Sequence, residues 1–176
     1  MIEKERNMLR ILLALSMLTP LLAVAEEVNV GNFVRAESDH MIRQNLATSG
    51  ASVGEIFHLR APTTPDNQPV IRMNQDTLYS AVALDLSKPV RVTLPDLEGR
   101  YQSMQVVNQD HYMTFEAQPG TYELTEESVG TRFAYVTFRT FADPKDPTDL
   151  EVAHAAQDAI VLEGGGDGPF DAPDWN

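Results

Sequence analysis

Residues Val70 to Leu86, with the sequence VIRMNQDTLYSAVALDL, carry the strongest structural signal in the chain. An apolar start leads into the polar group Asn74–Thr77, and a strict alternation follows. Even-numbered residues from Leu78 to Leu86 point one way, and odd-numbered residues from Tyr79 to Asp85 point the other. We therefore predict a half-buried β-strand that the chain enters through a tight polar turn.

The chain on either side of this strand has the same character of short strands and turns. Further strands are predicted at residues 55–60, 90–94, 101–107, 113–117, 121–124 and 133–138. The segments between them are rich in Pro, Gly and Asp, and Pro119-Gly120 suits a type II turn between two of the strands. The last strand is apolar on both faces, which indicates a central position in a sheet.

Helices are predicted at both ends of this set of strands. The first begins after Asn32 and ends near Gly50. Its inward side is formed by Phe33, Ala36, Glu37, His40, Met41 and Gln44. The second begins at Asp146-Pro147, an N-cap acceptor followed by proline at the first helical position. Its inward stripe consists of Leu150, Ala153, Gln157, Ile160 and Val161, before Gly164–Gly166 ends it. Strands in succession with helices only at the ends favour a mainly β fold, a β-sandwich, over an α/β sheet.

The N-terminus has the pattern of a cleaved signal peptide. Basic residues precede the apolar run Ile11–Leu22, and Ala23-Val24-Ala25 supplies small residues at a cleavage site. The run is shorter than the ~20 apolar residues of a membrane span, although a retained anchor helix is the alternative. We predict a signal peptide at residues 1–25, a sandwich domain at 26–163 and a flexible Gly/Asp-rich tail at 164–176. The protein is then periplasmic or secreted.

Composition excludes several classes of function. The chain has no cysteine, so it has no disulfides, no thiolate metal sites and no lipid anchor on a processed cysteine. Without residues 1–25 it carries 10 Lys and Arg against 24 Asp and Glu. The resulting net negative charge repels nucleic acid and anionic lipid. We expect no nucleic-acid partner, no membrane contact after cleavage of the signal, and no metal or cofactor.

Two polar loops contain the candidate site. If they meet at one end of the sandwich, a carboxylate could orient a histidine as a general base, with a tyrosine as proton donor. The candidate catalytic residues are Asp76, His111 and Tyr112, and the candidate ligand-binding residues are Asn74, Tyr79 and Asp110. Two alternatives stay open: ligand binding without chemistry, and a purely architectural role, because Asn and Asp cap turns and Tyr hydroxyls fasten sandwich corners.

Three other motifs favour structural interpretations. Gly50-Ala51-Ser52-Val53-Gly54 fits the G-x-S-x-G pattern, but it follows a predicted helix, whereas a nucleophile elbow follows a strand. Glu151, His154 and Asp158 share one stripe of the last helix, but only one such E-x-x-H copy exists. The run Gly164–Gly168 lacks the spacing of a calcium loop and suits a linker.

Several segments together resemble one family. They are NFVRAES at 32–38, the loop at 62–68 before VIRMN, DTLYS at 76–80, LPD at 94–96, MQVVNQDHY at 104–112, GTR at 130–132 and DP…HAAQDAI at 143–160. In this order they resemble the domain of unknown function 1254 (DUF1254). The resemblance implies an immunoglobulin-like β-sandwich, usually followed by a jelly-roll-like second domain (DUF1214). Many members carry Arg where this chain has Gln75, and this sequence ends at Asn176 without the second domain.

Two classes of function follow as expectations. The first is a binding or structural module that acts with a separate second-domain chain or as a homo-oligomer. This expectation rests on two apolar residues, Phe170 and Trp175, at an end expected to be polar. The alternative is a small-molecule hydrolase or lyase that uses Asp76, His111 and Tyr112. A third possibility, a piece of an interrupted two-domain gene, requires no function of its own.

Overall fold

The computed structural model describes residues 25–68 and 72–176. Residues 1–24 of the predicted signal peptide and residues 70–71 of the stretch quoted first lie outside this part. The described chain forms two units. Residues 28–172 hold every helix and strand named below. In the other unit, Glu26 and Trp175 form a parallel β-bridge. Among the described helices, none has the length and apolar character needed to cross a bilayer.

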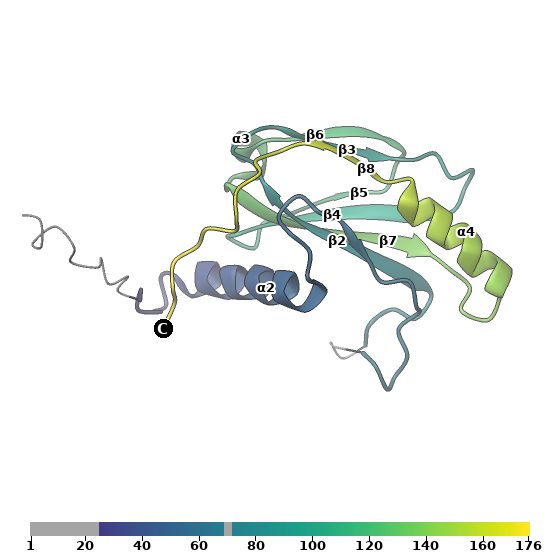
Figure 1. Ribbon diagram of the computed structural model, residues 1–176, viewed down its shortest axis with the longest axis horizontal. Helices are drawn as coiled ribbons and strands as arrows, with labels where there is room; N and C mark the ends of the chain where they lie inside the picture. Colours follow the sequence, from purple (N-terminus) through teal and green to yellow (C-terminus); the bar gives the residue numbers. More distant parts are fainter. Residues whose placement is uncertain (1–24, 69–71) are drawn as a thin grey trace, which may run out of the picture. The chain divides into compact units, whose positions relative to one another are not determined.

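The larger unit is built mainly from β-strands (Figure 1). Its elements are α2 (Phe33–Ser49), β1 (Phe57–His58), β2 (Thr77–Asp85), β3 (Val90–Leu94), β4 (Gln102–Asn108), β5 (Met113–Glu116), β6 (Gly120–Leu124), α3 (Glu126–Val129), β7 (Phe133–Phe141), α4 (Pro147–Asp158) and β8 (Val161–Gly164). One antiparallel sheet has the order β1-β2-β7-β4-β5, and the other has the order β6-β3-β8.

The two sheets share one hydrophobic core. The five-stranded sheet contributes Val82, Leu84, Met104, Val106, Ala134, Val136 and Phe138, and the three-stranded sheet contributes Val90, Val92, Leu94 and Leu124. The mainly β fold with two antiparallel sheets is thus confirmed, and so is the central position of β7, which lies in the middle of the larger sheet. The immunoglobulin-like type of the sandwich stays a prediction.

Strand β2 is more buried than its alternation predicted. The inward positions lie in the core as expected, but Ala81 and Ala83, on the other face, are also only 6% and 1% exposed. Their methyl groups lie in register with larger side chains, Phe57 beside Ala81 and Tyr135 beside Ala83. The prediction of a half-buried strand is therefore wrong, because this face is also covered: Ser38 and Ile42 of α2 border the same pocket as Tyr135.

The chain crosses between the sheets at the turn predicted for Pro119-Gly120. Strand β5 ends one sheet and β6 ends the other, so the turn at Pro119-Gly120 joins the two layers. The last helix is also shorter than predicted. It stops at Asp158, and Val161–Gly164 pair with β3 as strand β8. A strand edge with free backbone groups was available there, and β-branched Val161 suits a strand better than a helix.

Helix α2 buries a different side from the predicted one. Its buried residues are Ala36, Ser38, Asp39 and Ile42. Phe33 and Met41 are 56% and 46% exposed, and His40, which was expected to be partly buried, is exposed. The cause is a polar anchor: Gln109 Nε2 donates to Asp39 Oδ1 at 2.5 Å. A hydrophobic pattern cannot find a buried carboxylate whose partner lies elsewhere in the chain.

Helix α4 begins as predicted, with Asp146 accepting a hydrogen bond from the Thr148 N–H at 2.9 Å. The segment after β8 is fastened to the sandwich. The Gly166 N–H donates to the Asp85 carbonyl at 2.8 Å, and the ring of Phe170 stands edge-on to Phe133 with centroids 4.8 Å apart. Phe170, one of the two apolar residues on which the expectation of a partner chain rests, is thus packed against Phe133.

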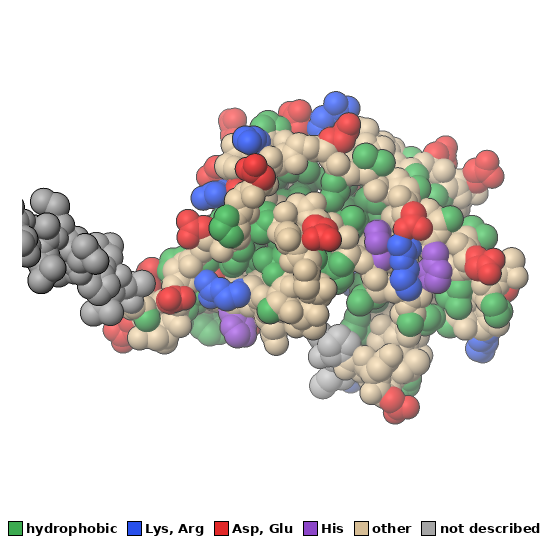
Figure 2. All heavy atoms as spheres, viewed as in Figure 1, with side chains coloured by type: hydrophobic (Ala, Val, Ile, Leu, Met, Phe, Trp, Pro, Cys, Tyr) green, Lys and Arg blue, Asp and Glu red, His purple; other side chains and the backbone are tan. Residues whose placement is uncertain are grey.

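Figure 2 shows one face of the molecule, coloured by type of side chain. Acidic and basic side chains are interspersed there, and acidic ones are the more numerous kind, as the formal net charge of −13 requires.

Candidate functional site

The predicted site residues lie at opposite ends of the five-stranded sheet. Strands β2 and β4 both pair antiparallel with β7, so they run in the same direction. The start of β2 pairs with Phe141, whereas the end of β4 pairs with Ala134. The part of β7 between these positions spans roughly 24 Å at about 3.4 Å per residue. Asp76 therefore cannot orient His111, and the predicted Asp–His–Tyr set does not form one site.

At the β2 end, the structure brings together Asn74, Asp76 and Tyr79. The Asn74 N–H donates to the Tyr79 hydroxyl, and the Asp76 N–H donates to Asn74 Oδ1, both at 3.2 Å. The guanidinium of Arg139 lies 5.4 Å from the centre of the Tyr79 ring. These contacts fit the architectural alternative, in which the tyrosine fastens the turn before β2.

At the β4 end, Asn108 organises the loop that holds the other three residues. Its Oδ1 accepts from the N–H groups of Asp110 and Tyr112 at 2.9 Å each. Within this tight turn His111 has a φ of 62°, and Asp110 forms an ion pair with Arg35 at 2.6 Å. Tyr112 is 76% exposed. The loop thus brings together Asp110, His111 and Tyr112 without Asp76, and its role in ligand binding stays a prediction.

The turn at residues 50–54 fits its structural interpretation. Helix α2 ends at Ser49, and β1 begins only at Phe57. Gly50 and Gly54 have φ values of 73° and 80°, in the left-handed region that favours glycine. Since a helix precedes Ser52, the geometry of a nucleophile elbow is not present.

The histidine of helix α4 is held by the segment after β1. His154 Nε2 and the Arg60 carbonyl oxygen are 2.7 Å apart, and Arg60 Nη1 donates to the His154 carbonyl at 3.0 Å. Arg60 also pairs with Asp158 and lowers the pKa of that carboxyl. Within residues 25–68 and 72–176, no three acidic, His or Cys side chains converge as metal ligands would. Of the Glu151–His154–Asp158 stripe, His154 and Asp158 therefore anchor Arg60.

A second polar cluster, which the sequence did not point to, joins β1, β2 and α4. Ser80 Oγ lies 2.7 Å from His58 Nδ1 and accepts from Gln157 Nε2 at 3.0 Å. Burial lowers the pKa of His58, and the charge of Arg60 lowers it further while Asp158 opposes this. A neutral imidazole whose Nδ1 accepts a hydrogen bond from the Ser80 hydroxyl satisfies all three groups. Ser80 is 1% exposed, so its hydroxyl is a structural link rather than an accessible nucleophile.

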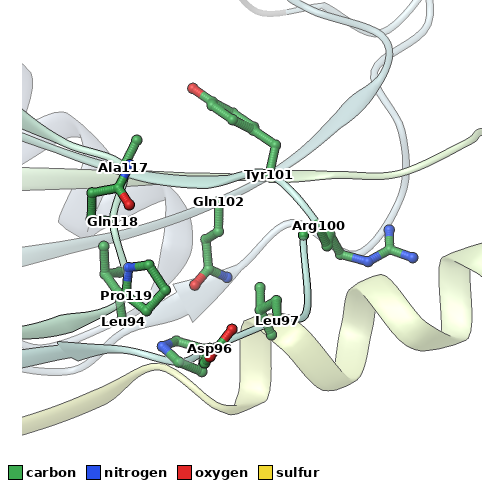
Figure 3. Close-up of a pocket in the computed structure, with 11 residues that line it drawn as sticks. Leu94, Asp96, Leu97, Arg100, Tyr101, Gln102, Ala117, Gln118 and Pro119 are labelled. Carbon is green, nitrogen blue, oxygen red and sulfur yellow. The ribbon is translucent and has the colours of Figure 1, made fainter.

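A pocket of about 280 Å³ opens at the end of the sandwich where the chain crosses between the sheets (Figure 3). Its lining comes from the end of β3, the following turn, the start of β4 and the β5–β6 connection: Leu94, Pro95, Asp96, Leu97, Gly99, Arg100, Tyr101, Gln102, Ala117, Gln118 and Pro119. Distant segments thus meet there, which explains why the sequence gives no motif for it.

The side chain of Gln102 reaches into this pocket between Pro119 and Leu97. Its Nε2 donates to Thr140 Oγ1 at 2.9 Å and to the Ala156 carbonyl at 3.1 Å. Because a carbonyl oxygen only accepts, this contact fixes which end of the amide is nitrogen. Gln102 Oε1 is buried and has no hydrogen-bond partner.

Arg100 is the one basic residue of the pocket lining, and its charge is neutralised by Asp149, which does not line the pocket. Arg100 Nη2 donates to Asp149 Oδ1 at 2.5 Å, and Nη1 donates to the Phe141 carbonyl at 2.7 Å. The hydrogen bond from Arg100, aided by the Asp143 N–H, lowers the pKa of Asp149 to about 2. Figure 3 shows the Arg100 guanidinium turned away from the pocket.

Comparisons with known proteins show a family but no activity. The family described as "Protein of unknown function (DUF1254)" matches residues 53–164. A similar solved structure is that of the VPA0106 protein from Vibrio parahaemolyticus, with a TM-score of 0.60 and 18% sequence identity. The similarity covers 80% of this chain and 39% of that one, so the chain spans well under half the length of that protein. No curated protein matches the chain. On the extent of the family match, the chain belongs to the DUF1254 family.

Proposed function

We propose that the protein is a protein-binding module, whose strand β5 pairs with the β5 strand of a second copy. The free edge of β5 carries this proposal. Strand β5 is the last strand of the five-stranded sheet, and no strand of the described chain pairs with its other side. An uncovered strand edge is a template for pairing with another chain.

The register of the β4–β5 pair shows which backbone groups face this edge. The Asn108 N–H donates to the Tyr112 carbonyl, so these two residues form a hydrogen-bonded pair. Such pairs alternate along an antiparallel ladder. Thr114 and Val106 are then the next hydrogen-bonded pair, whereas Met113 and Phe115 direct their N–H and C=O groups away from β4.

The same two residues place large apolar side chains in solvent. Met113 is 62% exposed, Phe115 is 58% exposed, and the preceding Tyr112 is 76% exposed. Natural edge strands usually carry a charged residue or a proline that prevents pairing. Strand β5 has only Glu116 at its end, so this edge lacks the usual protection.

The strand is complementary to itself. When two β5 strands pair antiparallel about a two-fold axis at Thr114, Met113 of one copy lies opposite Phe115 of the other, twice. Both of these positions carry free backbone groups, and a methionine sulfur next to an aromatic ring is a favourable contact. A two-fold interface of this kind closes after two copies. These features favour a second copy over an unrelated partner chain.

The mass of the protein in solution tests this proposal. Light scattering over a range of concentrations is expected to show a dimer for the wild type. Phe115→Ser removes the ring, and Phe115→Pro removes the edge N–H without loss of a β4 hydrogen bond, so both variants are expected to be monomers. Val161→Ser changes a residue of β8 that is 47% exposed, and it should leave the dimer intact. A monomeric wild type at every concentration contradicts the proposal.

We also propose that the protein is exported to the periplasm or secreted. The signal-peptide pattern of residues 1–25 supports this. Fractionation of the source cells with N-terminal sequencing is the test, and a mature chain that begins at Glu26 is expected. An intact N-terminus in the cytoplasm overturns it. The alternative function, a hydrolase or lyase using Asp76, His111 and Tyr112, lacks support because the two loops do not meet.

A further inference from the structure

We propose that the pocket around Gln102 binds a small molecule that carries a primary ammonium group on an apolar body. The pocket lies at the Leu94–Gly120 end of the three-stranded sheet and does not involve β5 residues. The proposal is therefore independent of dimer formation, and either can fail without the other.

The first observation is an unsatisfied acceptor inside the pocket. Gln102 is 6% exposed, and its Oε1 has no partner. A buried polar atom without a hydrogen bond costs stability, so such atoms in native proteins usually mark a bound water or ligand. Thr140 and Ala156 hold the nitrogen of the amide, and the side chain reaches into the pocket, so the pocket is the side from which a donor would approach Oε1.

The second observation is the charge at the rim. Asp96 borders the same pocket, and Figure 3 places it below the Gln102 amide. Its Oδ1 accepts from the Glu98 N–H at 3.1 Å in the turn. The carboxylate still has lone pairs for a ligand. Because Arg100 is neutralised by Asp149, Asp96 sets the sign of the charge that the pocket attracts. A cation with several N–H donors suits both acceptors.

The third observation is the apolar wall. Leu94, Leu97, Ala117 and Pro119 line the pocket beside the two acceptors. A volume of about 280 Å³ is near the lower limit of the range for small-molecule sites, roughly 300–1,000 Å³. The combination of convergent acceptors and an apolar wall selects an amine with a hydrocarbon or aromatic body over a hydrated metal ion.

The test uses 2-phenylethylammonium as the probe, titrated into the full chain and followed by amide NMR shifts. We expect saturable shifts confined to residues 94–102 and 117–119. The alcohol 2-phenylethanol has the same body with a neutral donor and should bind more weakly. The anion 3-phenylpropanoate should not bind, because it offers no donor to Gln102 and is repelled by Asp96.

Two substitutions measure the contributions of Asp96 and Gln102 to binding separately. Asp96→Asn keeps the oxygen that accepts from Glu98 and removes the charge, so binding of the ammonium should weaken about two- to fivefold, as for an exposed ion pair, with little change for the alcohol. Gln102→Met keeps the volume and removes the buried acceptor, which should weaken both probes about tenfold or more. Glu127→Gln, the same loss of charge in α3 at the other end of the sandwich, should change nothing.

The outcomes decide the proposal even if Gln102→Met fails to fold, because Asp96→Asn alters only an exposed side chain. Ammonium binding that is weaker in Asp96→Asn, with unchanged alcohol binding, supports it. Absence of site-specific shifts with the ammonium probe at millimolar concentration overturns it and leaves a water as the partner of Gln102. Equal binding of the cation and the anion also overturns it.

Discussion

At the scale of single residues, Asp85 is the carboxylate on which stability should depend most clearly. Its side chain is 2% exposed and accepts from Arg132 Nε and Nη2 at 3.0 and 2.9 Å. These hydrogen bonds, with one from the Ser87 N–H, lower its pKa to about 2 from 3.8, although burial opposes them. Between these values the unfolded chain binds a proton that the native chain does not, so stability is lost as the pH falls.

We predict that this pair contributes about 2 kcal/mol above about pH 4, and that the contribution disappears as the pH falls to about 2. Urea unfolding of the wild type and of Asp85→Asn across this range is the measurement. The variant should be less stable at neutral pH, and its stability should depend less on pH. Asp110→Asn breaks an exposed pair with Arg35 and should cost below about 1 kcal/mol. Parallel pH curves for Asp85→Asn and the wild type contradict the prediction.

At the scale of elements, helix α4 depends on its first turn. Asp146 caps it through the Thr148 N–H at 2.9 Å, and the helix supplies the Ala156 carbonyl that holds Gln102. Asp146→Ala should lower the free energy of unfolding by about 1 kcal/mol, because one N–H loses its acceptor. Lys145→Ala, next to the cap, removes no capping group and is the control. Equal effects of the two substitutions in urea unfolding argue against a capping role.

At the scale of the whole molecule, the formal net charge of −13 opposes the association of two copies. The proposed β5 contact is mainly apolar and backbone-mediated, so salt that screens the repulsion between the two negatively charged copies should strengthen it. We predict a tighter dimer at about 0.5 M salt than at about 0.02 M, since the Debye length falls well below 10 Å. Sedimentation equilibrium at both salt concentrations measures this. Weaker association at high salt means that ion pairs, rather than the β5 edge, hold the copies together.

The elements that the sequence predicted correctly are those with local causes. Three features are fixed by residues within the element itself, and the structure confirms all three. They are the alternation at residues 90–94, the strand from Phe133 that is apolar on both faces, and the Asp146-Pro147 helix cap. The inward side of α2 was wrong because Asp39 is buried against Gln109, which lies 70 residues further along the chain. The end of α4 was wrong because the edge of β3 was available for Val161–Gly164.

The mainly β class, most of the strands and the resemblance to the DUF1254 family could be read from the residues alone, because periodicity, turn residues and helix caps act over a few residues. Which loops meet became clear from the three-dimensional arrangement of the strands. It separated Asp76 from His111 along the length of β7, and it joined Gln102, Asp96 and Pro119 in one pocket. The order of strands in a sheet and the partners of a buried amide are set by contacts between distant segments, and no local pattern encodes them.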